Sequence, residues 1–181
     1  MCNSFNKRFL DEASKHWGEE AKPPGSGDLG FVKMAAELGL KGVLNNEGGP
    51  FGCVIVKDGK VIGKGNNRVT TINDPTAHAE IQAIRDACEH LGSHQLDGCV
   101  LYTSCEPCPM CLGAIYWARP DKVFYAATKE DAAASGFDDH FIYEEIALAP
   151  DERSIEFRQL GREEALSAFK AWDEKEDKIE Y

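Results

Sequence analysis

The sequence predicts an α/β protein, a three-layer α/β/α sandwich around a mixed five-stranded sheet. Two observations carry this prediction. Short β-rich runs alternate with helical patterns along the chain, and the first two runs flank an Asp-Gly pair, which indicates a hairpin. The hairpin makes the sheet mixed, because strands that are joined through a helix usually pair in parallel. With 181 residues, 43% of them hydrophobic, the chain can form one hydrophobic core.

The first 28 residues are predicted to form an extension, followed by one domain over residues 29–181. Apolar residues recur every fourth position in the extension, as in a short amphipathic helix: Phe5, Phe9, Ala13 and Trp17. The Pro- and Gly-rich residues 19–28 then predict a linker. We interpret the helix as a docked accessory element, because no apolar run resembles a signal peptide or a membrane span.

The first half of the domain contains four predicted elements. A helix is expected from about Leu29 to Leu44, followed by the hairpin strands 53–57 and 60–64. Asp74-Pro75 predicts the start of the next helix, with Asp as N-cap and Pro at the first helical position, and Gly92 predicts its end. We expect this second helix to bury a stripe of four residues: Ile81, Ile84, Cys88 and Leu91.

The second half adds three strands and two helices. Strands are predicted at residues 99–103, at 122–126 and, as an edge strand, at 155–158. A helix from Pro109 to Ala118 should stop before Pro120, and a heavily charged helix should cover about residues 162–177.

Charge and cysteine content narrow the class of protein. There are 31 acidic and 20 basic residues, and the formal net charge of −11 at pH 7 disfavours a nucleic-acid binder. The seven cysteines are an odd number, and a chain of this length needs no disulfide framework. We therefore expect a soluble, cytoplasmic protein that binds neither nucleic acid nor a membrane.

Three cysteines at three-residue spacing, Cys105, Cys108 and Cys111, predict a metal or redox site. An iron–sulfur signature would need a cysteine where Ile115 stands, so zinc is the better candidate. If Pro109 is the first helical residue, Cys108 is the N-cap and Cys111 the third residue, where the helix dipole favours thiolates. We assign Cys108 and Cys111 as ligands and give Cys105 a supporting or packing role, although Cys105 is also a candidate for a fourth ligand.

His78 is the predicted third ligand, because it is expected in the first turn of the helix that opens at Asp74-Pro75, beside the acidic Glu80. Three protein ligands leave a coordination position open, which is typical of catalytic zinc. The pair H-x-E and P-C-x-x-C is the signature of zinc-dependent nucleobase deaminases, in which the glutamate is the general acid/base. The H-x-E spacing alone does not show how Glu80 reaches a water molecule bound to the zinc, because residues two apart in a helix lie on different faces.

Further segments resemble the small, cytidine-deaminase-like guanine deaminases of bacteria, and the likeness covers about residues 29–181. Plant guanosine deaminase is a near relative, whereas tRNA adenosine deaminase shares only the zinc signature. The segments that carry the resemblance are Gly48–Gly52, Asn66-Asn67, Asn73–Glu80, Thr103–Cys111, Ala114–Pro120, Gly136–Asp139 and the terminal Tyr181.

The resemblance implies hydrolytic deamination of guanine to xanthine and ammonia by a zinc-activated hydroxide, with Glu80 as proton shuttle. One zinc ion per subunit would be held by His78, Cys108 and Cys111. Asp139 would lie near the reacting amino group. Five residues would contact the purine: Phe51, Asn67, Ala79, Trp117 and Tyr181.

The resemblance also implies a homodimer in which the C-terminal segment crosses to the partner subunit, so that Tyr181 completes the neighbouring site. The expected partner is otherwise a small purine. Three alternatives stay open. The substrate could be guanosine, adenine, cytosine or an aminotriazine; the zinc could be structural and closed by Cys105; or the protein could edit tRNA, which the net charge disfavours.

Overall fold

The computed structural model describes residues 27–181, which divide into a first compact unit that ends at Asp138 and a second unit, Asp139–Tyr181. The predicted amphipathic helix and most of the predicted linker lie outside the described residues. The residues that carry the zinc signature all belong to the first unit.

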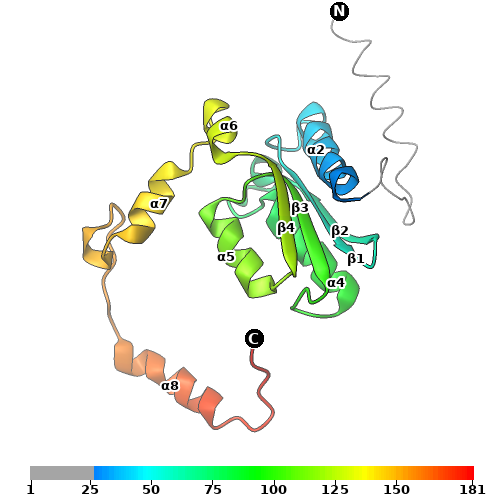
Figure 1. Cartoon of the computed structure of the whole chain (residues 1–181). Helices are drawn as coiled ribbons and strands as arrows, with labels where there is room; N and C mark the ends of the chain where they lie inside the picture. Colours follow the sequence, from blue (N-terminus) through cyan, green and yellow to red (C-terminus); the bar gives the residue numbers. More distant parts are fainter. Residues whose placement is uncertain (1–26) are drawn as a thin grey trace, which may run out of the picture. The chain divides into compact units, whose positions relative to one another are not determined.

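The first unit is built on a four-stranded sheet with the order β2-β1-β3-β4 (Figure 1). Strand β1 pairs antiparallel with β2 and β3, and β3 pairs parallel with β4, which confirms the mixed sheet. Both residues of the Asp58-Gly59 turn have positive φ, 51° and 75°, as a two-residue hairpin turn requires. The strands are β1 (Gly52–Lys57), β2 (Lys60–Asn66), β3 (Cys99–Cys105) and β4 (Lys122–Ala127).

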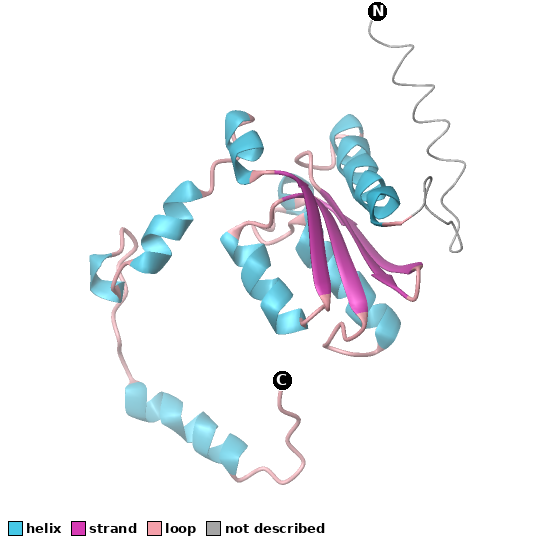
Figure 2. Ribbon diagram, viewed as in Figure 1, coloured by secondary structure: helices cyan, strands magenta, loops and turns pink. Residues whose placement is uncertain are grey.

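Helices cover both faces of this sheet (Figure 2), so the predicted three-layer α/β/α architecture is confirmed. Helix α2 (Asp28–Leu44) packs on β1 and β3 from one side, whereas α4 (Ala79–Leu91) packs on β2 and β1, with α5 (Pro109–Ala118) beside it, on the other. Two short helices, α3 (Val69–Ile72) and α6 (Lys129–Ala134), follow β2 and β4. None of the helices in the described range is long and apolar enough to cross a membrane.

Alternate residues of the central strands pack into two hydrophobic cores. Cys53, Ile55 and Leu101 pack in the core that α4 and α5 cover. Val54, Val56 and Tyr102 pack in the core beneath α2. Strand β1 is therefore buried on both faces, which explains its continuous apolar run.

The start of α4 differs from the prediction. The helix begins at Ala79, with His78 as N-cap, and not at Asp74-Pro75. Asp74 instead closes a local turn, in which its Oδ1 accepts hydrogen bonds from the backbone N–H and the hydroxyl of Thr76, at 2.8 and 2.7 Å. Asp and Pro favour turns as well as helix starts, and here they form the turn that precedes the helix.

Helix α4 also buries a different stripe from the predicted one. The four predicted residues, Ile81, Ile84, Cys88 and Leu91, are only partly buried. A Cβ atom on Gly63 would lie 2.6 Å from the Cβ atom of Ala87, so the missing side chain lets the helix lie close to β2. Small residues therefore occupy the centre of the contact. The buried residues of α4 are Ala79, Glu80, Ala83 and Ala87.

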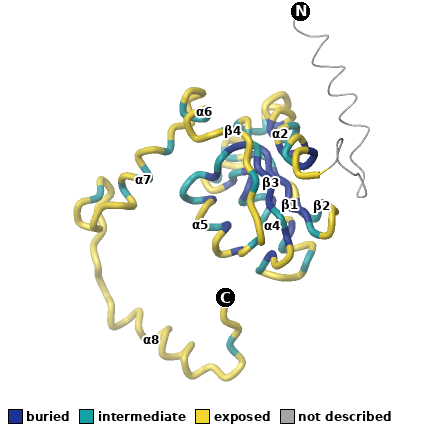
Figure 3. The backbone as a smooth tube through the Cα atoms, viewed as in Figure 1, coloured by how far each residue is buried: buried dark blue, intermediate teal, exposed yellow. Residues whose placement is uncertain are grey.

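The second unit contains α7 (His140–Ala147), a 3-10 turn at Pro150–Glu152 and α8 (Arg162–Asp173). The predicted edge strand at 155–158 is wrong: these residues form no strand, and the sheet of the described chain has four strands, not five. Apolar alternation makes a strand only where a neighbouring strand accepts its backbone hydrogen bonds, and this segment has none. Helix α8 also ends four residues before the expected residue 177. None of residues 139–181 is buried (Figure 3).

Candidate zinc centre and active site

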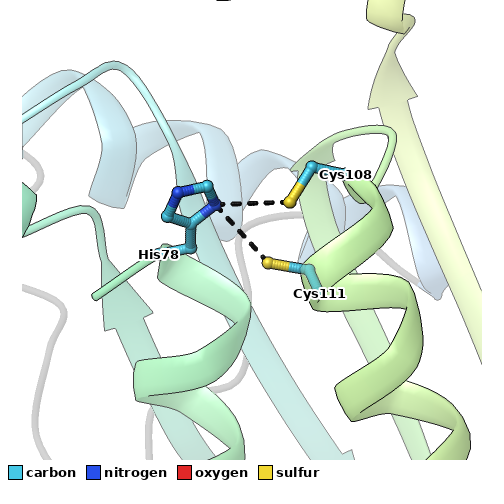
Figure 4. Close-up of side chains that lie close together, drawn as sticks. All are labelled: His78, Cys108 and Cys111. Atoms are coloured by element: carbon cyan, nitrogen blue, oxygen red, sulfur yellow. Dashed lines mark hydrogen bonds between the residues drawn. The ribbon is translucent and has the colours of Figure 1, made fainter. Parts of the chain in front are cut away.

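Three side chains from two helix starts converge in the first unit (Figure 4). The Nδ1 atom of His78 lies 3.5 Å from the Sγ of Cys108 and 3.6 Å from the Sγ of Cys111. The three potential ligand atoms all lie within 4.8 Å of one another. Thirty residues of sequence separate the histidine from the first cysteine, so the fold brings the predicted ligands together.

The spacing of these atoms fits a tetrahedral zinc ion. With Zn–N of about 2.0–2.1 Å and Zn–S of about 2.3 Å, a tetrahedral angle places N and S about 3.5 Å apart. The two N···S distances agree with that value. The donor set of one imidazole and two thiols is also one that zinc prefers, and three ligands leave a fourth position open. His78, Cys108 and Cys111 therefore fit the zinc ion that the sequence predicts.

Local helix geometry places all three side chains. His78 and Cys108 are the N-caps of α4 and α5, and each has an extended backbone, with ψ near 160°. Pro109 occupies the first helical position and Cys111 the third, as predicted. The two helix starts meet beyond the carboxyl end of β3. Their aligned backbone N–H groups favour negative charge on the sulfurs.

The two thiols are electrostatically coupled. The pKa of Cys108 falls to about 4, mainly because Cys111 donates a hydrogen bond to its sulfur, whereas burial opposes the shift and His78 adds to it. The same hydrogen bond raises the pKa of Cys111, and burial adds to the rise. Zinc would bind both sulfurs as thiolates, so its affinity would depend on pH.

Glu80 lies in the same cluster. It is at the second position of α4 with 6% of its surface exposed, and its Oε2 lies 3.5 Å from the Sγ of Cys111. Burial raises the pKa of the Glu80 carboxyl, and a hydrogen bond from its own backbone N–H opposes the rise. A raised pKa suits a carboxyl that must take up and release a proton near neutral pH.

Cys105 lies apart from the three-residue cluster. Its Sγ donates a hydrogen bond to the carbonyl oxygen of Thr128 at 3.4 Å, at the start of α6. The residues that follow Cys105 and Thr128 are also hydrogen-bonded, because the Lys129 N–H donates to the Glu106 carboxylate at 3.2 Å. The contact with Thr128 agrees with the supporting or packing role predicted for Cys105, which stays a prediction.

Asn67 is held in a fixed orientation beside the glycine-rich segment before β1. Its Oδ1 accepts hydrogen bonds from the backbone N–H groups of Gly49 and Val69, at 3.2 and 3.3 Å. The neighbouring Arg68 N–H donates to the carbonyl oxygen of Ala77 at 2.9 Å, which ties this loop to the residue before His78. Asn67 is buried, with 6% of its surface exposed. Its amide NH₂ is the part of the side chain that a substrate can use.

An aromatic pair adjoins this loop, and only one of its members was predicted. The rings of Phe51 and Phe137 meet edge to face, with centroids 5.0 Å apart. Phe137 belongs to the Gly136–Asp139 segment but was not a predicted site residue. Nothing in its local pattern indicates the contact, because 86 residues separate the two phenylalanines.

The remaining predicted site residues are placed differently. Ala79 is fully buried at the first position of α4, next to His78. Trp117 lies on α5, where 63% of its surface is exposed, and the structure does not bring it to the cluster. Asp139 and Tyr181 belong to the second unit, so their predicted roles stay predictions.

Fold and site together define a zinc-dependent deaminase. The family model of the cytidine and deoxycytidylate deaminase zinc-binding region matches residues 26–127, and the chain belongs to this family. Within it, the chain is 62% identical over 151 residues to guanine deaminase of Bacillus subtilis, a match that covers 83% of this chain and 97% of that protein. The X-ray structure of that guanine deaminase superposes with a TM-score of 0.84 at 60% identity, over 86% of this chain and 99% of the other.

Two further relatives are less similar. The guanine deaminase of Nitrosomonas europaea has a TM-score of 0.62 at 32% identity and covers 73% of each chain. The tRNA-specific adenosine deaminase of Aquifex aeolicus is 47% identical over 97 residues, which are 54% of this chain and 64% of that protein. The likeness to tRNA-specific enzymes is thus shorter than the likeness to the Bacillus subtilis guanine deaminase.

Proposed function

We propose that this protein deaminates guanine hydrolytically, with xanthine and ammonia as products. One observation carries the proposal: the likeness to the Bacillus subtilis guanine deaminase runs over 97% of that protein at 62% identity. The matched stretch of 151 residues is longer than the whole first unit, so it includes part of Asp139–Tyr181. The substrate is therefore inferred from more than the shared zinc signature.

His78, Cys108 and Cys111 would hold the zinc ion and leave its fourth position open. Bound there, zinc supplies a water molecule that is acidic enough to act as a nucleophile at neutral pH. Glu80 would accept one proton of this water and deliver it to ring nitrogen 3. It would then carry the second proton, from the new hydroxyl on carbon 2, to the amino group that leaves as ammonia. The raised pKa of Glu80 and its contact with Cys111 support this role.

Asn67 supports guanine over adenine as the substrate. Both accepting directions of its Oδ1 are directed at backbone N–H groups, so the side chain offers hydrogen-bond donors to a ligand. The 6-oxo group of guanine can accept a hydrogen bond from the Asn67 amide, whereas the 6-amino group of adenine would place a donor opposite that donor. Phe51 supplies an apolar ring for the purine, and the backbone of Ala79 a further contact.

We extend the proposal to a homodimer that exchanges its C-terminal segments. None of residues 139–181 is buried, although several large apolar side chains lie in this range. Such a segment gains stability only when these side chains pack against another surface. Exchange would bring Tyr181 to the partner's purine pocket and Asp139 near the reacting amino group, and Trp117 would join the pocket. The apolar side chains with the largest exposure are Phe141, Ile146, Ile155, Leu160, Phe169 and Ile179.

The domain division and the location are part of the same proposal. Residues 29–181 would form the deaminase and residues 1–28 an accessory extension. A zinc site with two thiolate ligands requires reduced cysteines, which supports a cytoplasmic enzyme.

A substrate panel tests the proposal. The purified protein is incubated with guanine, guanosine, adenine, cytosine and an aminotriazine, and ammonia release is measured together with zinc content. We expect ammonia from guanine, with one xanthine formed for each ammonia. Turnover of another compound alone would assign a different substrate, and stoichiometric zinc without any turnover would indicate a structural centre.

A further inference from the structure

We propose that Phe137 is a positioning residue of the purine pocket: it fixes the ring of Phe51 and anchors the chain where the C-terminal segment begins. The proposal rests on the proposed function, because the purine contact of Phe51 is part of that function. It adds a residue that the sequence analysis did not assign.

The backbone around Phe137 is fixed by the way in which α6 ends. Gly136 has φ of +87°, and its N–H donates to the carbonyl oxygen of Ala133 at 3.0 Å. The N–H of Phe137 donates to the carbonyl oxygen of Ala132, also at 3.0 Å. These two bonds form a Schellman motif, with the glycine in the left-handed conformation that the motif requires. The backbone at Phe137 is therefore fixed by the end of α6.

The Phe137 side chain does not make the contact that is usual in a Schellman motif. The residue that follows the left-handed glycine commonly packs against the last turn of its own helix. Phe137 instead places its ring edge to face with Phe51, at 5.0 Å between centroids and an interplanar angle of 86°. Although 44% of Phe137 is exposed, this contact gives its ring a defined partner.

Gly49 connects the aromatic pair to Asn67. A Cβ atom at Gly49 would lie 3.2 Å from Phe51 and 3.3 Å from Phe137, so the two rings pack directly over this backbone. The same glycine donates its N–H to Asn67 Oδ1 and accepts a hydrogen bond from the N–H of Phe51 at 2.8 Å. The ring of Phe137 thus packs on the segment that joins two of the predicted purine contacts, Phe51 and Asn67.

Phe137 also lies immediately before the boundary between the two units. The second unit begins at Asp139, and Phe137 is two residues earlier. Fixing Phe137 to Phe51 therefore fixes the point at which the chain leaves the pocket.

A double-mutant cycle on the full-length, zinc-loaded enzyme tests the proposal. The variants are Phe137→Leu, Phe51→Leu and the double variant, with Leu40→Ala as control, since Leu40 on helix α2 has the same exposed fraction of 44% as Phe137. The measurements are kcat and KM for guanine, the equilibrium Kd of xanthine, zinc content and melting temperature. Xanthine has no amino group at carbon 2, so its binding is read without turnover.

We expect Phe137→Leu to raise the KM for guanine and the Kd of xanthine about two- to tenfold, the range for loss of one aromatic pair. Zinc content should stay the same and kcat should change less than KM. In the Phe51→Leu background the further loss should be much smaller, because Phe137 acts through Phe51. Phe137→Tyr, which keeps the ring, should recover most of the affinity, and Leu40→Ala should leave both constants unchanged.

Two results would overturn the proposal. One is a Phe137→Leu enzyme with a lower melting temperature but unchanged KM and xanthine Kd, which would make Phe137 a purely stabilising residue. The other is a double variant whose KM and xanthine Kd rise by the product of the two single-variant factors, because Phe137 would then act independently of Phe51. If the wild-type enzyme binds xanthine but does not deaminate guanine, the proposed function fails while the cycle on xanthine still decides the role of Phe137. A wild-type enzyme that binds neither purine would overturn both.

Discussion

The Sγ atom of Cys111 lies 3.5 Å from Oε2 of Glu80, so a thiol that fits the zinc ion touches the carboxyl that we propose as the proton carrier. The contact exists because His78 is the N-cap of α4, with an extended backbone, whereas Glu80 is at the second helical position. The two side chains therefore do not follow helical spacing and both reach Cys111. This geometry explains how an H-x-E pair can serve a single metal centre.

Replacing Glu80 by Gln should separate metal binding from proton transfer. The variant keeps His78 and both cysteines, so zinc content should remain stoichiometric. Turnover of guanine should fall by about 10²–10⁴-fold, the usual contribution of general acid–base catalysis. Steady-state kinetics and metal analysis of the same sample check this. Near-wild-type turnover would remove Glu80 from the mechanism.

The buried carboxyl should also make the metal-free protein sensitive to pH. Burial raises the pKa of Glu80, so the folded state keeps this proton to a higher pH than the unfolded chain, which releases it near about pH 4.3. Stability should therefore fall as the pH rises from that value through the folded-state pKa. In Glu80→Gln this loss is absent, so its melting temperature should exceed that of the wild type increasingly toward neutral pH. Melting temperatures that stay a constant interval apart from pH 4 to pH 8 would contradict this.

The three neighbouring cysteines should differ in their effect on zinc. Cys111→Ala should lose both zinc and activity, because it removes one of three ligands. Cys105→Ala is the matched control. It removes only the hydrogen bond to Thr128, so zinc should stay bound and the melting temperature should decrease slightly. Stoichiometric zinc in Cys111→Ala, together with zinc loss in Cys105→Ala, would mean that Cys105 and Cys108 are the true pair.

Asn67→Asp should reduce the efficiency of guanine turnover while leaving the loop intact. The aspartate can still accept the N–H groups of Gly49 and Val69, but it has no donor for the 6-oxo group. Loss of a buried donor to substrate typically costs at least tenfold in kcat/KM. Kinetics with guanine and a melting curve test this. An unchanged kcat/KM would exclude Asn67 from substrate recognition.

Removing residues 178–181 should damage guanine turnover without removing zinc, because every proposed ligand lies far upstream. If the segment is exchanged, co-expression of this truncated chain with Glu80→Gln should restore part of the activity. One site of the mixed dimer would then have both an intact Glu80 and a donated Tyr181. Full activity of the truncated chain would exclude a role for the tail in the pocket. Mixed dimers that form but stay inactive would exclude the exchange.

Local signals predicted most of the fold. The Asp58-Gly59 turn, the helix from Pro109 to Ala118 and the Gly92 helix end all depend on neighbouring residues, and all three are confirmed. The errors arose where distant contacts decide. The start of α4 depends on whether Asp74 caps a helix or a turn, and the strand expected at 155–158 needed a partner that the fold does not supply.

In the candidate site, too, the residues that depend on local signals were predicted and those that depend on distant contacts were not. The zinc signature identified His78, Cys108 and Cys111 because their spacing follows from helix starts. The orientation of Asn67 and the contact between Phe51 and Phe137 could not be predicted, since they depend on loops that meet only in the folded chain. A close approach at Gly49 leaves no pattern in a single sequence.

The most direct test of the account follows the oxygen atom that enters the product. Guanine is incubated with the zinc-loaded enzyme in water enriched in oxygen-18, and the xanthine is analysed by mass spectrometry. Hydrolysis at carbon 2 requires one solvent oxygen in each xanthine, with an equal amount of ammonia, and Glu80→Gln should form far less of both. Xanthine without the heavy isotope, or no xanthine from an enzyme that contains its zinc, would contradict the account.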